Sequence, residues 1–361
     1  MTPRQKQIIG FVSFAAFVAI VLVLPGWIGA FRAQQLAYVA IYLIALLGLN
    51  ILTGYTGQIS LGHGAFMAIG GYTTAILMVG NAQFGQEGLL GIGGGMKDIW
   101  TIPIAGLVAG IAGLAFGLPA LRLSGLYLAL ATFAIAVALP SAIKRFEEFT
   151  GGGSGINLFG VPELTAGIVP VEIFGQSLTF NDWLYYLCWT IALFAFAVAW
   201  LILRGRTGRA FRAVRDSETA AVSSGVSLAR YKTLAFGISA AYAGVAGSLF
   251  AIATTFVNPD TFPIALSIFL LVGVVVGGLG GLSGLVFGAV FIQFLPLWAQ
   301  GEGVASRLPN FIVDRTKEPG APAIIYGVIL ILLMFFLPNG VGGIFRRAGR
   351  ALAGWRYSRS A

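Results

Sequence analysis

The sequence predicts an all-α, polytopic membrane protein with about ten transmembrane helices, some of them short or broken by glycine. Hydrophobic residues make up 58% of its 361 residues and charged residues only 10%, whereas about a quarter of the residues in soluble proteins are charged. Its apolar runs are also long enough, at roughly 17–25 residues, to cross about 30 Å of hydrocarbon. No soluble domain fits between these runs, so we expect one transmembrane domain over residues 1–361.

The candidate spans follow one another along the whole chain. They lie at residues 8–24, 36–53, 63–79, 99–121, 123–143, 183–203, 233–257, 264–280, 282–300 and 322–338. The third, eighth, ninth and tenth are short or interrupted by glycine. The first follows a basic start, as a secretory signal peptide does, but it is longer than the usual apolar core of such a peptide. We expect it to remain as an uncleaved span.

The basic residues predict the orientation of these spans. Ten crossings from a cytoplasmic N-terminus place 15 of the 22 Lys and Arg residues inside the cell. Short cytoplasmic loops of membrane proteins carry such an excess of Lys and Arg. We therefore expect both termini in the cytoplasm, with a cytoplasmic loop at 204–232 and a basic cytoplasmic tail at 339–361. This placement accounts for the net charge of +9, and no nucleic-acid partner is expected.

The spans lack the side chains that several function classes need. They contain no Asp, Glu, Lys or Arg. The chain's one histidine, His63, is the only side chain at membrane depth that could take a positive charge. A proton-coupled carrier needs a relay of such groups, whereas a sodium-coupled carrier can use carbonyls and hydroxyls. The sequence has no phosphate-binding loop of the type G-x-x-x-x-G-K-[ST] and no Ser, His and Asp set. With one cysteine, Cys188, and one histidine, we expect no catalytic residues and no metal site.

The best candidates for a transport pathway lie in residues 54–64, GYTGQISLGHG. Four glycines weaken a helix there, and freed backbone groups are tolerated only where they line a cavity or are buried in protein. The polar side chains offered to a substrate are Tyr55, Thr56, Gln58, Ser60 and His63. Two other interpretations stay open: His63 as a neutral histidine bonded to backbone, and the glycines as sites of close helix packing. For the spaced set Ala240, Gly244 and Ser248 we favour packing.

The loop at 204–232 has the signals of a short helix. Asp216 or Ser217 suits the N-cap, Glu218 suits the first turn and Gly225 suits the position after the C-cap. The helix between them has about two turns. Phe211 and Val214 in the preceding segment offer an apolar face among arginines. We expect a docking element on the cytosolic side; the alternative is a solvated basic loop at the lipid headgroups.

An ordered set of segments extends over about residues 36–345. They are 49–77, 121–140, 150–156, 208–249, 257–290 and 337–345. Taken together, these segments resemble a known family, the permease subunits of branched-chain amino acid ABC importers, and most closely their M-type member. Residues 80–98 and 301–321 depart from the family pattern, and both fall on the predicted outer face, where a binding protein would contact the chain.

The resemblance implies a multi-pass permease of the bacterial plasma (inner) membrane. It implies as partners a homologous second permease, two cytosolic ATPase subunits and an extracytoplasmic substrate-binding protein. The chain itself would bind no cofactor, because the partner subunits use the ATP. The loop residues implied in coupling to the ATPases are Arg209, Arg212, Arg215, Asp216, Ser217, Glu218, Thr219 and Gly225.

The substrate is the least determined property. Relatives of the same build move urea, short amides and some aromatic acids, so those substrates remain alternatives to branched-chain amino acids. A stand-alone sodium-coupled carrier or channel is a less favoured alternative, and a membrane-embedded enzyme is opposed by the missing acid, base and metal sets.

Overall fold

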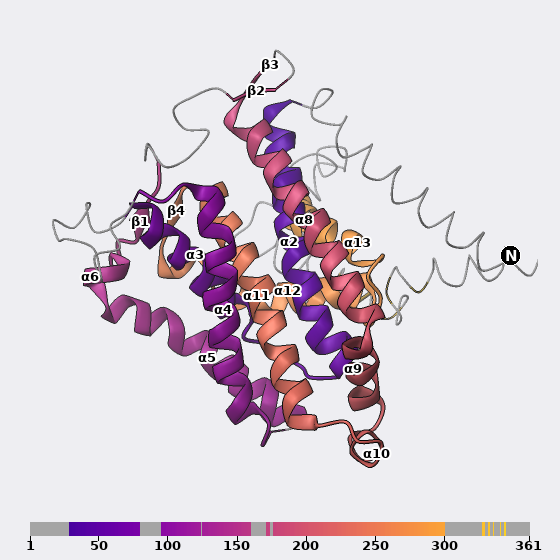
Figure 1. Ribbon diagram of the computed structural model, residues 1–361. Helices are drawn as coiled ribbons and strands as arrows, with labels where there is room; N and C mark the ends of the chain where they lie inside the picture. Colours follow the sequence, from indigo (N-terminus) through magenta and orange to yellow (C-terminus); the bar gives the residue numbers. More distant parts are fainter. Residues whose placement is uncertain are drawn as a thin grey trace, which may run out of the picture.

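A computed structural model describes residues 29–79, 95–123, 125–159, 171–173 and 176–299, together with a few isolated positions between 327 and 343. The described chain forms a bundle of helices (Figure 1). Several predicted features lie outside the described residues: the span at 8–24, most of the span at 322–338, nearly all of the tail and the whole of segment 301–321.

Eight helices of the bundle correspond to eight of the predicted spans. Six helical stretches are long and apolar enough to cross a membrane, and two more, α3 and α13, are apolar but shorter. The predicted polytopic helical class is confirmed, and so is the shortness of the third and ninth spans. The eight helices are α2 (Ala30–Asn50), α3 (His63–Val79), α4 (Asp98–Ala120), α5 (Gly125–Arg145), α8 (Phe180–Arg204), α11 (Leu228–Thr254), α12 (Ile264–Gly277) and α13 (Leu285–Ala299).

Shorter elements connect these helices. They are the π-helical turn η2 (Ile51–Tyr55), α6 (Glu147–Thr150), α9 (Arg206–Asp216), α10 (Glu218–Ser223) and the 3-10 turn η5 (Pro259–Thr261). Two small antiparallel strand pairs lie in the connections. Strand β1 (Ile156–Asn157) pairs with β4 (Phe256–Val257), and β2 (Val171–Ile173) pairs with β3 (Gln176–Leu178).

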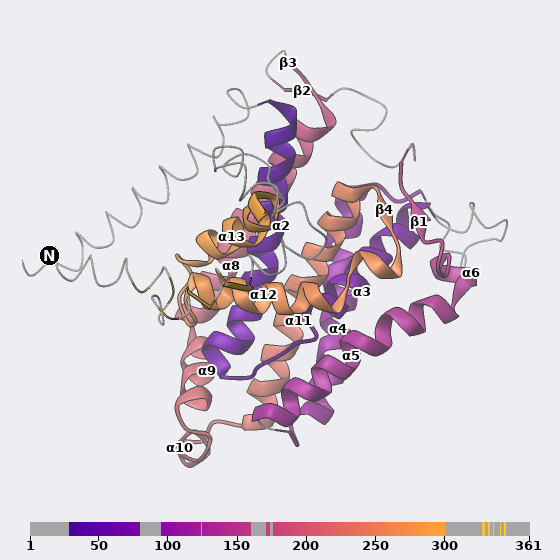
Figure 2. The ribbon, with the colours of Figure 1, turned by 180° about the vertical axis from the view of Figure 1, so that it is seen from behind.

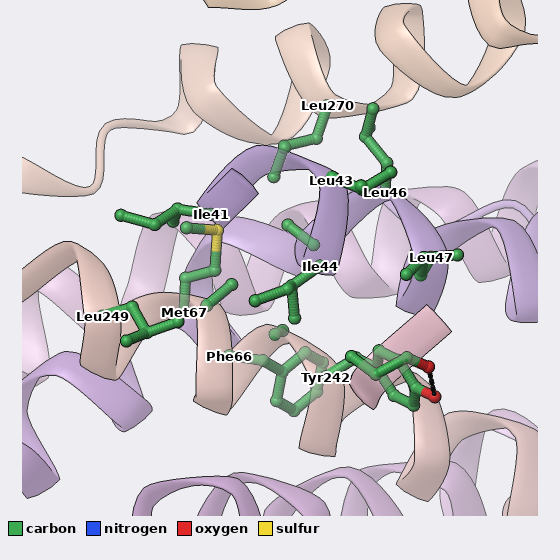
Figure 3. Packing of buried hydrophobic residues seen from close by; sticks show 14 of the residues in the cluster. Ile41, Leu43, Ile44, Leu46, Leu47, Phe66, Met67, Tyr242, Leu249 and Leu270 are labelled. Carbon is green, nitrogen blue, oxygen red and sulfur yellow. Dashed lines mark hydrogen bonds between the residues drawn. The ribbon is translucent and has the colours of Figure 1, made fainter. Parts of the chain in front are cut away.

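Helices α2 and α11 form the centre of the bundle, and α4, α5 and α8 form its periphery (Figures 1 and 2). The side chains of α2 meet those of α3, α11 and α12 in a continuous apolar core (Figure 3). The peripheral helices leave large apolar side chains exposed, for example Leu107 on α4, Leu130 on α5 and Phe194 on α8. Exposed apolar surface of this extent fits helices that face lipid.

Small residues allow α11 to pack closely against its neighbours. A Cβ added at Gly244 would lie 2.4 Å from the Cβ of Ala109 on α4, and one added at Gly247 would meet the backbone of Met67 on α3. On the same helix, the Ser248 hydroxyl accepts a hydrogen bond from Thr74 Oγ1 at 2.6 Å. The predicted set Ala240, Gly244 and Ser248 therefore serves helix packing, which small residues favour inside a bilayer.

Candidate functional site

The helix that begins with α2 breaks inside the protein. It passes from Asn50 into the π-helical turn η2 and ends after Thr56; α3 then begins at His63. The break starts at Gly57, whose φ of 72° lies in the left-handed region that glycine adopts at little cost. The glycine-broken helix predicted for residues 54–64 is thus present, and most of the segment is buried.

Neighbouring side chains satisfy the backbone groups that the break frees. Thr132 Oγ1, on α5, accepts a hydrogen bond from the Leu61 backbone N–H at 2.9 Å. Ser267 Oγ, on α12, accepts one from the Gly64 N–H, also at 2.9 Å. The broken segment is therefore fixed between α5 and α12, as buried irregular backbone in a membrane protein must be.

The predicted pathway residues are brought together but are turned toward the protein's own groups. Tyr55, Thr56, Gln58, Ser60 and His63 are all buried. Thr56 Oγ1 donates to the Leu52 carbonyl at 2.6 Å, and Gln58 Nε2 donates to Thr56 Oγ1 at 2.9 Å. Ser60 Oγ accepts from the Gly62 N–H at 3.3 Å. In this conformation these polar groups stabilise the break, and their contact with a substrate stays a prediction.

His63 has the environment of a structural histidine. Its Nε2 lies 2.9 Å from the Ala45 carbonyl oxygen on α2. A carbonyl can only accept, so Nε2 carries the proton. The ring joins the start of α3 to the middle of α2, which matches the interpretation of His63 as a histidine bonded to backbone.

The glycines of the break also serve close packing. A Cβ at Gly62 would lie 2.9 Å from the Thr132 carbonyl oxygen, and one at Gly64 would lie 2.8 Å from Ser267 Oγ. A Cβ at Gly54 would collide with the side chain of Asn50 and the backbone of Gly280. Both proposed uses of these glycines, weakening the helix and allowing close approach, are therefore seen in one segment.

Asn50 belongs to the site although sequence reasoning did not single it out. Its Oδ1 accepts from the Gly280 N–H at 3.0 Å, and its Nδ2 donates to the Gly281 carbonyl at 3.1 Å. The fully buried amide thus holds the turn between α12 and α13 against the end of α2. The available signal was its polarity: Asn50 is the only amide in the apolar run 36–53, and buried polar groups need partners.

The predicted helix in the 204–232 loop is present as α10. Ser217 Oγ accepts from the Ala220 N–H at 3.3 Å and caps the start. At the end, the Val226 N–H donates to the Ala221 carbonyl and the Gly225 N–H to the Val222 carbonyl, each at 2.9 Å. With φ of 80° at Gly225, these bonds form a Schellman motif. The N-cap and the glycine after the C-cap are where the sequence predicts them.

The apolar face predicted among the loop arginines is not offered to a partner. Phe211 and Val214 of α9 are buried inside this chain, and the Phe211 ring contacts Tyr231 edge-on at 6.3 Å between ring centroids. The expectation that this face is available for docking is wrong, because α11 and its neighbours already cover it. The large apolar side chain that α10 does expose is Val222.

The charged loop residues divide between the protein and the solvent. Glu218 of α10 forms an ion pair with Lys232 at the start of α11, at 2.7 Å, and the Lys232 side chain is only 9% exposed. Arg212 Nη1 donates to the Leu203 carbonyl at 3.3 Å and Arg215 Nη1 to the Gly54 carbonyl at 3.0 Å. Arg209 and Thr219 are exposed. The loop is therefore anchored on several helices and presents a small outer surface.

Residues 31–337 match the model of a protein family, the permease component of branched-chain amino acid transport systems. This chain belongs to that family. It is 35% identical to the LivM permease protein of Escherichia coli, over 83% of this chain and 67% of that protein. It is 24% identical to the LivH permease protein of Salmonella typhimurium, over 84% and 91% of the two chains. A probable LivM of Methanocaldococcus jannaschii is 23% identical.

The family and the apolar helices together define a multi-pass permease of the bacterial inner membrane. The identity to the Escherichia coli LivM is higher than that to the Salmonella typhimurium LivH, which agrees with the predicted M type. As a permease component, the chain is a transport subunit and not a catalytic enzyme. No solved structure matches the chain.

Proposed function

We propose that this permease carries branched-chain amino acids into the cell as one half of a permease pair driven by two cytosolic ATPase subunits. A binding protein on the outer face delivers the substrate. The relatives named LivM and LivH are described as parts of high-affinity branched-chain amino acid transport systems, and the presence of two permease names supports a pair.

The anchored loop α9–α10 is the observation that carries this proposal. Its second helix, α10, is short and capped at both ends, and it lies at one end of the bundle. The side chains of Thr219 and Val222 are exposed on the outer surface of α10. A solvated basic loop has no need of caps at both ends or of an ion pair with a buried lysine. A rigid element of this kind suits a protein that receives movement from a separate motor subunit.

The function is tested by uptake in a strain that lacks this chain and in the same strain complemented with it. We expect uptake of radiolabelled leucine to depend on the chain and on ATP, and the tagged chain to co-purify with a second permease and an ATPase. Chain-dependent uptake of urea, a short amide or an aromatic acid in place of leucine would assign a different substrate. Leucine transport by the purified chain alone in liposomes would contradict the ATP-driven mechanism.

A further inference from the structure

We propose that Arg215 is the positioning residue that carries movement of α9 and α10, the docking loop, to the broken segment at residues 51–62, which comprises η2 and the break that follows it. The inference rests on the proposed function, since it assumes that an ATPase moves α9 and α10. Arg215 then has an inward role: it acts on the broken segment of its own chain. The position of Arg215 in the loop would by itself suggest a contact with the ATPase.

The guanidinium of Arg215 joins two parts of the chain that are 161 residues apart. Its Nη1 donates to the Gly54 carbonyl at 3.0 Å, while Asp216 Oδ1 accepts from Nε at 3.0 Å and lies 2.9 Å from Nη2. The carboxylate therefore fixes the orientation of the planar group that reaches the broken helix. Such a fork of donors is specific to arginine.

Two glycines pack closely against the side chain of Arg215. A Cβ at Gly57 would lie 3.2 Å from Arg215 Cγ, and a Cβ at Gly280 would lie 3.2 Å from Nη1. Both glycines also have positive φ, at 72° and 71°. The arginine side chain thus lies between the break and the turn that joins α12 to α13.

The Gly54 carbonyl is a suitable acceptor for a cation. It lies in the last turn of the helix, where carbonyls lack the usual helical partner, and positive charge near that end interacts favourably with the helix dipole. A hydrogen bond from a charged donor is stronger than one between neutral groups. A shift of α9 would therefore displace the Gly54 carbonyl at the break.

Asn50 extends the connection to a third segment. It lies one helical turn before Gly54 and holds the backbone of Gly280 and Gly281 with two hydrogen bonds. A displacement of Gly54 by Arg215 would therefore change the packing of the turn between α12 and α13. The broken segment is itself bonded to α5 through Thr132 and to α12 through Ser267. One arginine thus connects the docking loop to the helices that hold the broken segment, α5 and α12.

The test measures leucine transported per ATP hydrolysed in the reconstituted complex with leucine-loaded binding protein. In Arg215→Gln we expect this ratio to fall at least about fivefold, the lower end of the usual range for coupling between sites, while ATPase co-purification is unchanged. Arg215→Lys keeps the charge but loses the planar fork of donors, so its ratio should fall less. Arg122→Gln is the control, because it removes the same charge from an exposed position in the α4–α5 connection.

The two proposals fail in different ways. An unchanged transport ratio in Arg215→Gln, with the ATPase still bound, would overturn the role of Arg215 but leave the proposed function intact. Loss of ATPase co-purification would place Arg215 in the docking surface and also overturn the inward role. Absence of any ATPase from the parent complex would instead reject the proposed function. If Arg215→Gln does not accumulate, Asp216→Asn should lower the ratio by loosening the guanidinium, and an unchanged ratio in that variant would count against the proposal.

Discussion

Individual polar residues at membrane depth in this permease act mainly on its own backbone. Thr132 and Ser267 accept hydrogen bonds from the N–H groups of Leu61 and Gly64, and His63 donates to the Ala45 carbonyl. The reason is general: water is absent from the bilayer core, so a freed backbone group must be satisfied from within the protein. A polar residue in such a span can therefore indicate a nearby helix break as well as a substrate contact.

His63 provides a test of this structural role. In His63→Ala we expect leucine uptake per molecule to fall less than tenfold, because the ring is fully enclosed and bonded to backbone. The amount of folded protein should fall as well, since a lost hydrogen bond costs about 1 kcal/mol and the removed ring leaves a cavity. Uptake normalised to the amount of chain in the membrane separates the two effects. Abolished uptake at normal membrane levels would instead make His63 part of the pathway.

The site could be predicted from sequence only where its contacts are local. The glycines and hydroxyls of residues 54–64 are neighbours in the chain, and their pattern indicates a broken helix. The bonds from Arg215 to Gly54 and from Gly280 to Asn50 join residues 161 and 230 positions apart. No periodicity or motif contains that information, because those pairs meet only after the helices pack.

At the scale of elements, the chain's helices begin and end where local chemistry dictates. Helix α8 starts with a capping box between Thr179 and Asp182, and α10 ends on Gly225 in a Schellman motif. Such signals act within a few residues, so the spans and the short loop helix follow from sequence. The burial of Phe211 and Val214 does not follow, because an amphipathic segment does not reveal whether its apolar face packs on its own chain or on another.

Gly225 allows a test of α10 that changes little else. No atom lies within 4 Å of a Cβ built at Gly225, and its φ is 80°. Gly225→Val should therefore destabilise the end of α10 through the backbone alone, by roughly 1–2 kcal/mol. Gly225→Asn is the matched control, because asparagine tolerates the left-handed conformation. We expect ATPase co-purification to weaken in the valine variant and to be retained in the asparagine variant. Equal recovery of ATPase in both would argue against α10 as the docking element.

For the molecule as a whole, α11 determines which connections share a membrane face. Helix α10 directly precedes α11, and strand β4 directly follows it and pairs with β1. A helix of 27 residues spans about 40 Å at 1.5 Å per residue, which exceeds the hydrocarbon thickness of about 30 Å. Figure 1 shows α10 and the β1–β4 pair at opposite ends of α11. The loop at 204–232 and the turn at 151–157 are therefore expected on opposite sides of the bilayer.

The basic residues then predict which side is the cytoplasm. The excess of Lys and Arg in the 204–232 loop predicts that α10 lies inside the cell and the 151–157 turn outside. Two exposed serines, Ser223 on α10 and Ser154 in the turn, are suited to a labelling experiment, since cysteine differs from serine by one atom. The native Cys188 is buried and should give little background. A membrane-impermeant maleimide should label Ser154→Cys in intact spheroplasts and Ser223→Cys only in inside-out vesicles. The reverse labelling pattern would invert the proposed orientation and remove the docking loop from the reach of a cytosolic ATPase.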